Sequence, residues 1–90
     1  MEDSTHLDLA EVKLIVETAL LASQEPLSAT ELRRLFEEDP GSDAIRNVLD
    51  ELRADWEGRG VELVATASGW RFRTRPQYQP FLDRLNPQKP

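Results

Sequence analysis

The 90-residue sequence has no cysteine and only one histidine, so two residue types that often build reactive or metal-binding sites are scarce. Without cysteine the chain can form neither a disulfide nor a thiolate metal site. The one histidine, His6, lies in the polar stretch "MEDSTHLD", where we interpret it as a solvated side chain. The composition therefore predicts no metal and no cofactor.

The sequence also lacks long apolar runs and the motifs of common enzymes. No apolar run approaches the roughly 18 residues of a membrane span, and no segment has the charged, apolar and small-residue order of a signal peptide. No glycine-rich phosphate-binding motif occurs, and the serines and threonines stand at cap and turn positions. We therefore expect a soluble, cytoplasmic protein with no membrane contact, no catalytic residue and a non-enzymatic function.

Charge is distributed unevenly along the chain, whose formal net charge is −6. Residues 1–27 contain six acids and one lysine, which gives −5, and residues 28–58 contain nine acids and four arginines, again −5. Residues 59–90 contain six bases and two acids, which gives +4. The sequence thus predicts a basic element on an acidic body, which argues against attraction of the whole surface to phosphate.

Two helices are predicted in the first third of the chain. The first runs over residues 9–22 behind the N-cap Asp8, and the second begins at a capping box made by Ser28 and Glu31. Apolar residues at helical spacing give each helix a predicted buried stripe. The stripes are Leu9, Val12, Ile15, Val16, Ala19 and Leu20 in the first helix, and Leu32, Leu35 and Phe36 in the second.

A third helix is predicted after the break "EDPGSD", with Ser42 or Asp43 as its cap and Gly58 or Gly60 at its end. The spacing then changes to a period of two in "VELVA" and "WRFRT", on either side of the turn "TASG". This pattern predicts a β-hairpin, and "RPQYQPFLDRL" predicts a short helical segment after it. The stripe of the third helix is Ile45, Val48, Leu49, Leu52 and Trp56.

Three helices followed by a hairpin is the order of a winged helix-turn-helix, so we expect an α+β fold with a short C-terminal helical segment. Residues 8–85 would form this domain. Residues 1–7 would be a flexible N-terminal segment, and residues 86–90, "NPQKP", a tail or a truncated linker.

The outer surface of the third helix argues against the reading of DNA. A winged helix that reads DNA places this helix in the major groove. Arg46, Asn47 and Arg53 could contact bases there, but five acids share the surface and would face phosphate. Direct DNA binding is therefore disfavoured, and a DNA-binding transcriptional regulator that uses the arginine-rich wing stays as the alternative.

The wing carries a basic strip, Arg71, Arg73 and Arg75, predicted to face outward. Three interpretations remain open: a phosphate contact, a solvated face that balances the acidic helices, or a protein interface, where arginine and aromatic residues are enriched. The aromatic residues of the wing alternate with the arginines and so face the helices. We interpret three aromatic side chains as core anchors: Trp56, Trp70 and Phe72.

The first predicted helix has a second apolar stripe, which contains Ala10, Leu14 and Leu21. A surface helix of so small a domain does not need two such stripes. Either the helix is covered on both sides, with Phe81 and Leu85 of the last segment as the cover, or Leu14 and Leu21 form a self-association surface. The candidate interface residues are thus Leu14, Leu21, Arg71, Arg73, Arg75 and Tyr78.

Two stretches of the sequence resemble one known family. The first, residues 14–32, reads "LIVETALLASQEPLSATEL". The second and more specific, residues 49–85, reads "LDELRADWEGRGVELVATASGWRFRTRPQYQPFLDRL". Both are similar to the N-terminal winged-helix domain of ScpB, segregation and condensation protein B, and the likeness extends over about residues 9–85.

The resemblance implies a homodimer formed through this domain, with the kleisin ScpA and the SMC ATPase as further partners. It implies a role in bacterial chromosome condensation and segregation, on the nucleoid. Members of the family carry a second winged-helix domain, on which the kleisin contact depends heavily, so kleisin binding is not assigned to residues of this chain. The proline-flanked end at residues 86–90 favours a fragment cut in a linker over a shortened member.

Overall fold

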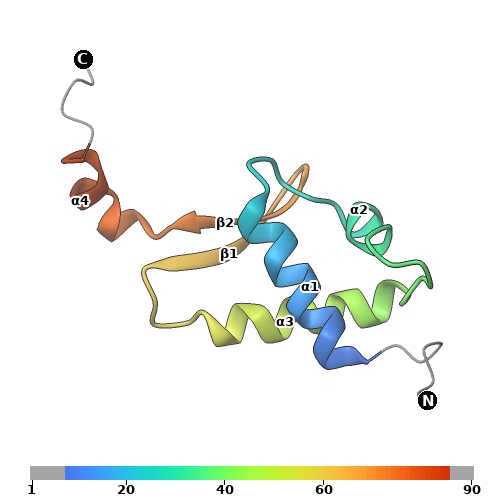
Figure 1. Ribbon diagram of the computed structural model, residues 1–90. Helices are drawn as coiled ribbons and strands as arrows, with labels where there is room; N and C mark the ends of the chain where they lie inside the picture. The colour runs from blue at the N-terminus through green and yellow to red at the C-terminus, as the bar shows by residue number, and fades with distance from the viewer. Residues whose placement is uncertain (1–7, 86–90) are drawn as a thin grey trace.

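The computed structural model describes residues 8–85 and folds them into helices and one β-hairpin (Figure 1). The expected N-terminal segment 1–7 and tail 86–90 lie outside these residues. The order of elements agrees with the predicted α+β winged helix. In chain order they are α1 (Leu9–Ala22), α2 (Ala29–Arg33), α3 (Ser42–Asp55), β1 (Val61–Thr66), β2 (Gly69–Thr74), the 3-10 turn η1 (Pro76–Tyr78) and α4 (Gln79–Asp83).

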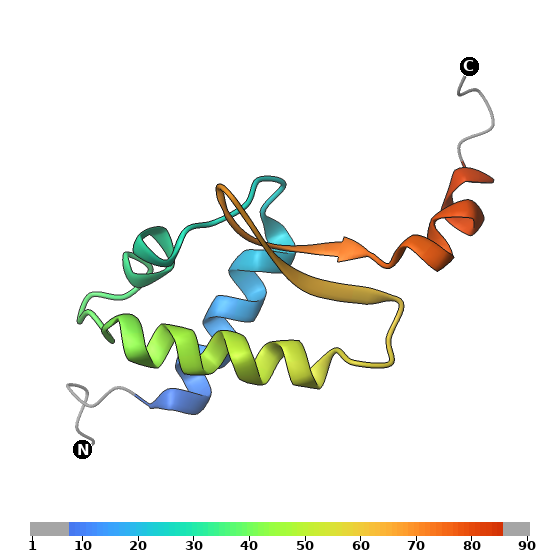
Figure 2. The same ribbon diagram turned by 180° about the vertical axis from the view of Figure 1, so that it is seen from behind.

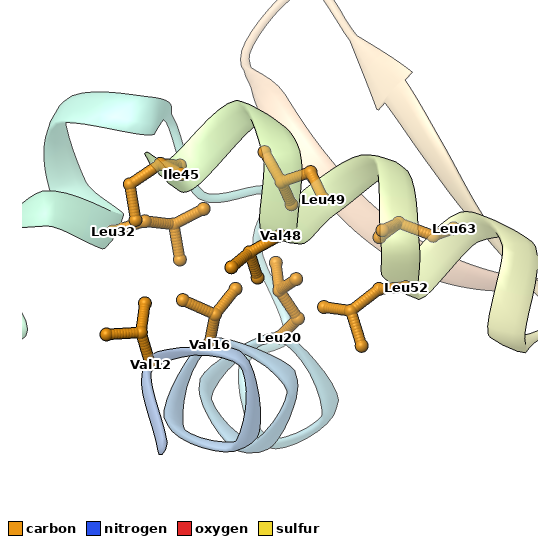
Figure 3. Close-up of a cluster of buried hydrophobic side chains, with 9 residues drawn as sticks. All are labelled: Val12, Val16, Leu20, Leu32, Ile45, Val48, Leu49, Leu52 and Leu63. Atoms are coloured by element: carbon orange, nitrogen blue, oxygen red, sulfur yellow. The ribbon is translucent and has the colours of Figure 1, made fainter. Parts of the chain in front are cut away.

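The core lies where α1 packs across α3. The α1 side chains Val12, Val16 and Leu20 point toward α3 in Figure 3 and form one wall of the core. Burial of such side chains is the main source of stability in a domain of this size. The remaining core residues, all at most 4% exposed, are Leu32, Ile45, Val48, Leu49, Leu52 and Leu63.

Local hydrogen bonds start the first two helices, as predicted. The Asp8 side chain accepts from the Ala10 N–H at 3.0 Å. Ser28 and Glu31 form the reciprocal capping box, with N···O distances of 3.1 Å and 2.9 Å. These bonds satisfy N–H groups that have no partner inside the helix.

The start of α3 differs from the prediction, which placed a cap at Ser42 or Asp43. The helix follows Gly41, which has a φ of 91° and makes no side-chain cap. Instead, Asp39 accepts from the Gly41 N–H at 2.8 Å and from the Arg33 guanidinium at 2.6 and 3.0 Å. Because glycine adopts a positive φ without strain, Gly41 can turn the chain into the helix where a serine could not.

The hairpin is joined to the helices by an additional strand pairing. Its register places Leu63 opposite Phe72 and Ala65 opposite Trp70. Leu27, in the loop between α1 and α2, exchanges two backbone hydrogen bonds with Trp70, at 2.9 and 2.8 Å. This pairing, which the sequence analysis does not predict, fixes the hairpin against the loop that leads into α2.

Three expectations about burial are wrong. Leu9, predicted in the buried stripe, is 59% exposed at the first position of α1. Leu35 is 45% exposed, because α2 is only five residues long and ends before it. The last segment does not cover α1: η1 and α4 extend beyond the end of the hairpin, away from α1, in both views of the molecule (Figures 1 and 2). Phe81 and Leu85 are accordingly 61% and 80% exposed.

Candidate protein-interaction surfaces

The first surface, here named the α1 face, consists of Leu14, Thr18 and Leu21. At about 100° per residue, these positions lie on the side of α1 opposite the buried Val12 and Val16. Leu14 is 60% exposed and Leu21 is 52% exposed. The Thr18 hydroxyl donates to the Leu14 carbonyl at 2.8 Å, so it needs no further acceptor. The α1 face is therefore an apolar strip that the fold leaves in solvent.

The second surface, here named the arm, comprises η1, α4 and the two residues that follow, residues 76–85. Tyr78 lies at its root, where a Cβ built on Gly60 would meet the tyrosine ring at 3.7 Å. The rest of the arm stands apart from the helices (Figure 2). Its exposed apolar side chains are Tyr78, Phe81, Leu82 and Leu85.

Arg75 fastens the root of the arm. Its guanidinium donates to the carbonyls of Arg59 and Trp56, at 2.7 and 3.3 Å, and to Glu62 Oε1 at 3.1 Å. Its backbone N–H donates to the Gly60 carbonyl at 2.9 Å. The prediction that Arg75 faces outward is wrong, because its side chain turns toward the segment after α3 and donates to carbonyls there.

The remaining two arginines of the wing differ in their surroundings. Arg73 Nε lies 3.0 Å from Glu62 Oε2, on the facing strand, so Glu62 accepts from both Arg73 and Arg75. Arg71 is paired in register with Val64 and is exposed. An exposed ion pair contributes little to stability, but it neutralises part of the positive charge of the wing. Of the predicted basic strip, Arg71 and Arg73 are exposed, and Arg73 is paired with Glu62.

The three predicted anchors occupy two kinds of position. Trp70 and Phe72 pack against the buried core. Trp56 is half-buried and packs on Phe72, with ring centroids 4.8 Å apart. Its indole N–H donates to Glu17 Oε2 at 2.8 Å, and the Arg59 guanidinium lies 5.2 Å from its ring centroid. Trp56 thus connects α1 to the end of α3 at the edge of the core.

Carboxylates dominate the surface where α1 meets α3. Lys13 lies 2.8 Å from Asp55 and 3.3 Å from Glu51. These hydrogen bonds, first that to Asp55 and then that to Glu51, raise the pKa of Lys13. Arg53, which the sequence offers as a base contact, lies over the Trp70 ring at 5.9 Å from its centroid.

Neither a metal cluster nor a membrane span occurs in the part of the chain that the structure describes. Residues 8–85 contain no group of three or more histidines, aspartates or glutamates placed to hold a metal ion. Over the same residues, no helix has the length and apolar character needed to cross a bilayer.

The structure brings Leu14 and Leu21 together on one helix face and places Tyr78 on the arm. Sequence reasoning predicted the short helical segment of the arm but not its exposure, because its apolar spacing is also typical of a buried helix. The sequence analysis also did not identify Leu82 as exposed. It did not identify Glu62 and Asp39 as hydrogen-bond acceptors that hold the fold together.

Comparison with known sequences gives one family. The family model described as "Segregation and condensation complex subunit ScpB" matches residues 14–90. A "Segregation and condensation protein B homolog" from Coxiella burnetii is 48% identical over 80 residues, which are 87% of this chain and 38% of that protein. A "Segregation and condensation protein B" from Syntrophotalea carbinolica is 33% identical over 86 residues, which are 93% of this chain and 43% of that protein. The chain spans less than half the length of these curated relatives.

Solved structures share the fold. ScpB from Mycobacterium tuberculosis aligns with a TM-score of 0.79 and 28% identity, over 90% of this chain and 51% of that one. A dimer of the ScpB N-terminal domain complexed with ScpA peptide aligns with a TM-score of 0.74 and 29% identity, over 91% of this chain and 95% of that one. The second structure therefore corresponds to this chain over nearly its whole length.

The sequence and structural comparisons agree with the motifs quoted from the sequence. The family match covers most of the chain, and the C. burnetii protein is 48% identical to it. The solved ScpB structures have the same fold as this chain. The protein belongs to the ScpB family of segregation and condensation proteins.

Proposed function

We propose that this domain is a non-enzymatic dimerisation module of a bacterial SMC–kleisin complex, which acts in chromosome condensation and segregation. Its partners are a second copy of the same chain, the kleisin ScpA and the SMC ATPase, and its location is cytoplasmic and nucleoid-associated. Membership of the ScpB family supports this function. The related ScpB N-terminal domain, a dimer complexed with ScpA peptide, supports a second copy and ScpA as partners.

The observation that carries the proposal is the α1 face. Leu14 and Leu21 are more than half exposed on the helix that supplies one wall of the core. Clustered exposed apolar side chains on a small domain favour a protein interface. A self-association surface on α1, the second interpretation of the extra apolar stripe, is therefore the one we propose.

The alternative function, a DNA-binding regulator, receives less support from the contacts of the wing. Glu62 accepts from Arg73 and Arg75, so two of the three arginines are engaged within the chain. The third helix, which would enter the major groove, exposes several carboxylates. Phosphate binding relies on unpaired cations, and this domain offers few of them on the relevant elements.

A double substitution tests the proposed self-association surface. Leu14→Asp combined with Leu21→Asp places two charges on the α1 face, and we expect the dimer dissociation constant to rise by at least about tenfold. Sedimentation velocity at micromolar concentrations measures this constant. Circular dichroism verifies that the variant still folds, because neither leucine lies in the core.

Leu35→Asp is the matched control. It adds the same charge at an apolar side chain that is 45% exposed but lies outside α1 and the arm. We expect its dimer to be unchanged. A folded double variant that dimerises as tightly as the control would contradict the assignment of the interface to α1.

A further inference from the structure

We propose that the arm of one chain docks on the α1 face of a second copy, and that the arm of the second copy docks on the α1 face of the first. The inference rests on the proposed function, because it names the two surfaces through which the proposed dimer forms. A reciprocal exchange of this kind closes on itself by two-fold symmetry and leaves no arm unpaired.

Exposed apolar side chains concentrate on these two elements. Among residues 8–85, eight large apolar side chains are exposed, and all but Leu35 lie on α1 or the arm. Each surface therefore gains free energy when it leaves water. The seven are Leu14 and Leu21 on the α1 face, Leu9 on the other side of α1 at its start, and Tyr78, Phe81, Leu82 and Leu85 on the arm.

Within one chain, the arm is held away from the α1 face. Both views show α4 beyond the far end of the hairpin (Figures 1 and 2). Arg75 donates side-chain hydrogen bonds to three acceptors and its N–H to Gly60, which fixes the direction in which the arm leaves β2. An arm that folded back onto its own α1 would have to break these bonds. A second copy offers the same apolar face without that cost.

The short length of α4 gives a second reason for a partner. A five-residue helix gains too little from its own hydrogen bonds to be stable alone, so packing has to hold it. Only the near end lies close to the rest of the chain, where the Tyr78 ring is beside Gly60. Phe81 and Leu85, farther along, remain mostly in solvent. Docking on a second chain supplies the packing that the far end lacks.

Charge favours the arm over a second α1 as the occupant of the α1 face. α1 contains Glu11, Lys13 and Glu17, a formal charge of −1, whereas the arm contains Asp83 and Arg84, a formal charge of zero. Packing α1 against α1 brings together two segments of like charge. Packing the neutral arm against α1 avoids this repulsion, which favours the exchanged pairing over the symmetric one.

Cross-linking tests the pairing directly, because the natural chain has no cysteine and each introduced thiol is therefore unique. Two versions of the full chain that differ in tag size, one with Leu14→Cys and one with Leu85→Cys, are produced together and treated with a short bis-maleimide. We expect a mixed cross-linked product that contains both tags. Leu35→Cys, mixed with Leu85→Cys, is the control and should give none.

The outcomes separate the inference from the proposed function. Sedimentation of each cysteine variant first establishes whether it dimerises. A dimer without the mixed product, or one in which Leu14→Cys chains cross-link only to each other, overturns the arm exchange and leaves dimerisation standing. A chain that sediments only as a monomer contradicts both.

Complementation of two damaged chains gives a second measurement. Leu14→Asp with Leu21→Asp damages the α1 face, and Phe81→Asp with Leu85→Asp damages the arm. Each variant alone should lose both contacts of the dimer, whereas a one-to-one mixture retains one intact arm and one intact α1 face that meet each other. We expect the mixture to form a heterodimer at least about tenfold tighter than either variant alone. A mixture that dimerises no better than its components contradicts the arm exchange.

Discussion

Gly69 lies where β2 passes closest to the loop between α1 and α2. Its φ is 142°, and a Cβ at this position would lie 2.4 Å from the carbonyl carbon and oxygen of Leu27. Gly69→Ala therefore strains the backbone and pushes the hairpin away from Leu27, whose two hydrogen bonds with Trp70 weaken. We expect the free energy of unfolding to fall by at least about 2 kcal/mol, measured by urea denaturation.

Gly58→Ala is the control for this substitution. Gly58 also has a positive φ, 80°, but a Cβ there would meet no atom within 4 Å. Gly58→Ala should lower the free energy of unfolding by about 1 kcal/mol, because it adds backbone strain but no steric clash. Equal losses for the two variants would contradict the importance of the close approach to Leu27.

Asp39 is the side chain whose ionisation the fold perturbs most clearly. The Arg33 guanidinium, followed by the Gly41 N–H, lowers the pKa of Asp39 from 3.8 to about 2. A carboxylate with a depressed folded pKa stabilises the fold above its unfolded pKa and loses that contribution as pH falls toward 2. Arg33→Ala should raise the pKa of Asp39 toward 3.8, as measured by NMR titration of the carboxyl carbon.

The neighbouring Arg34 provides the control, because it is exposed and makes no ion pair with Asp39 among the residues described. Arg34→Ala should leave the pKa of Asp39 low. A value that stays near 2 in the Arg33→Ala variant would show that a group other than Arg33 holds this carboxylate ionised.

At the scale of elements, Arg75 determines how the arm leaves the hairpin. In the natural chain, each of the three guanidinium nitrogens of Arg75 donates to one acceptor. Arg75→Lys keeps the positive charge but leaves a single nitrogen as the donor. We expect a loss of about 1–3 kcal/mol in the free energy of unfolding, together with larger amide motions in residues 76–85 by NMR relaxation.

Arg71→Lys serves as the matched control on the same strand, since Arg71 is exposed and its side chain makes no hydrogen bond within residues 8–85. This change should alter stability by less than about 0.5 kcal/mol. An Arg75→Lys variant with the stability and arm motions of the control would mean that Arg75 does not position the arm.

Periodicity and capping residues predicted most of the elements. The stripe of α1 and the Ser28 capping box are local features, so the sequence alone specifies them. The start of α3 was missed because the side chain that replaces the cap, Asp39, takes its role from an ion pair with Arg33. Rules that consider only the residues next to a helix start cannot predict such a contact.

The exposed surfaces show a second limit of sequence reasoning. Apolar spacing indicates that a face is buried, but it does not say whether the same chain or another one buries it. For Leu14 the two possibilities were left open, and for Phe81 and Leu85 the intramolecular one was wrong. Only the path of the chain after Arg75 separates the arm from α1.

At the scale of the whole molecule, the winged-helix frame presents its apolar surfaces away from the helix that would read DNA. The outer surface of α3 is rich in carboxylates, and the α1 face and the arm carry the exposed apolar side chains. Membership of the ScpB family supports the proposed use of this fold in assembly. The proposed role as a dimerisation module depends on self-association of the chain.

The most direct test is the mass of the unaltered chain in solution. The chain has a mass of 10.3 kDa. In sedimentation equilibrium over a range of micromolar concentrations, the weight-average mass should rise toward twice that mass, and one monomer–dimer dissociation constant should describe all of the data. A mass that stays at 10.3 kDa up to the highest concentration would contradict the proposed dimerisation module.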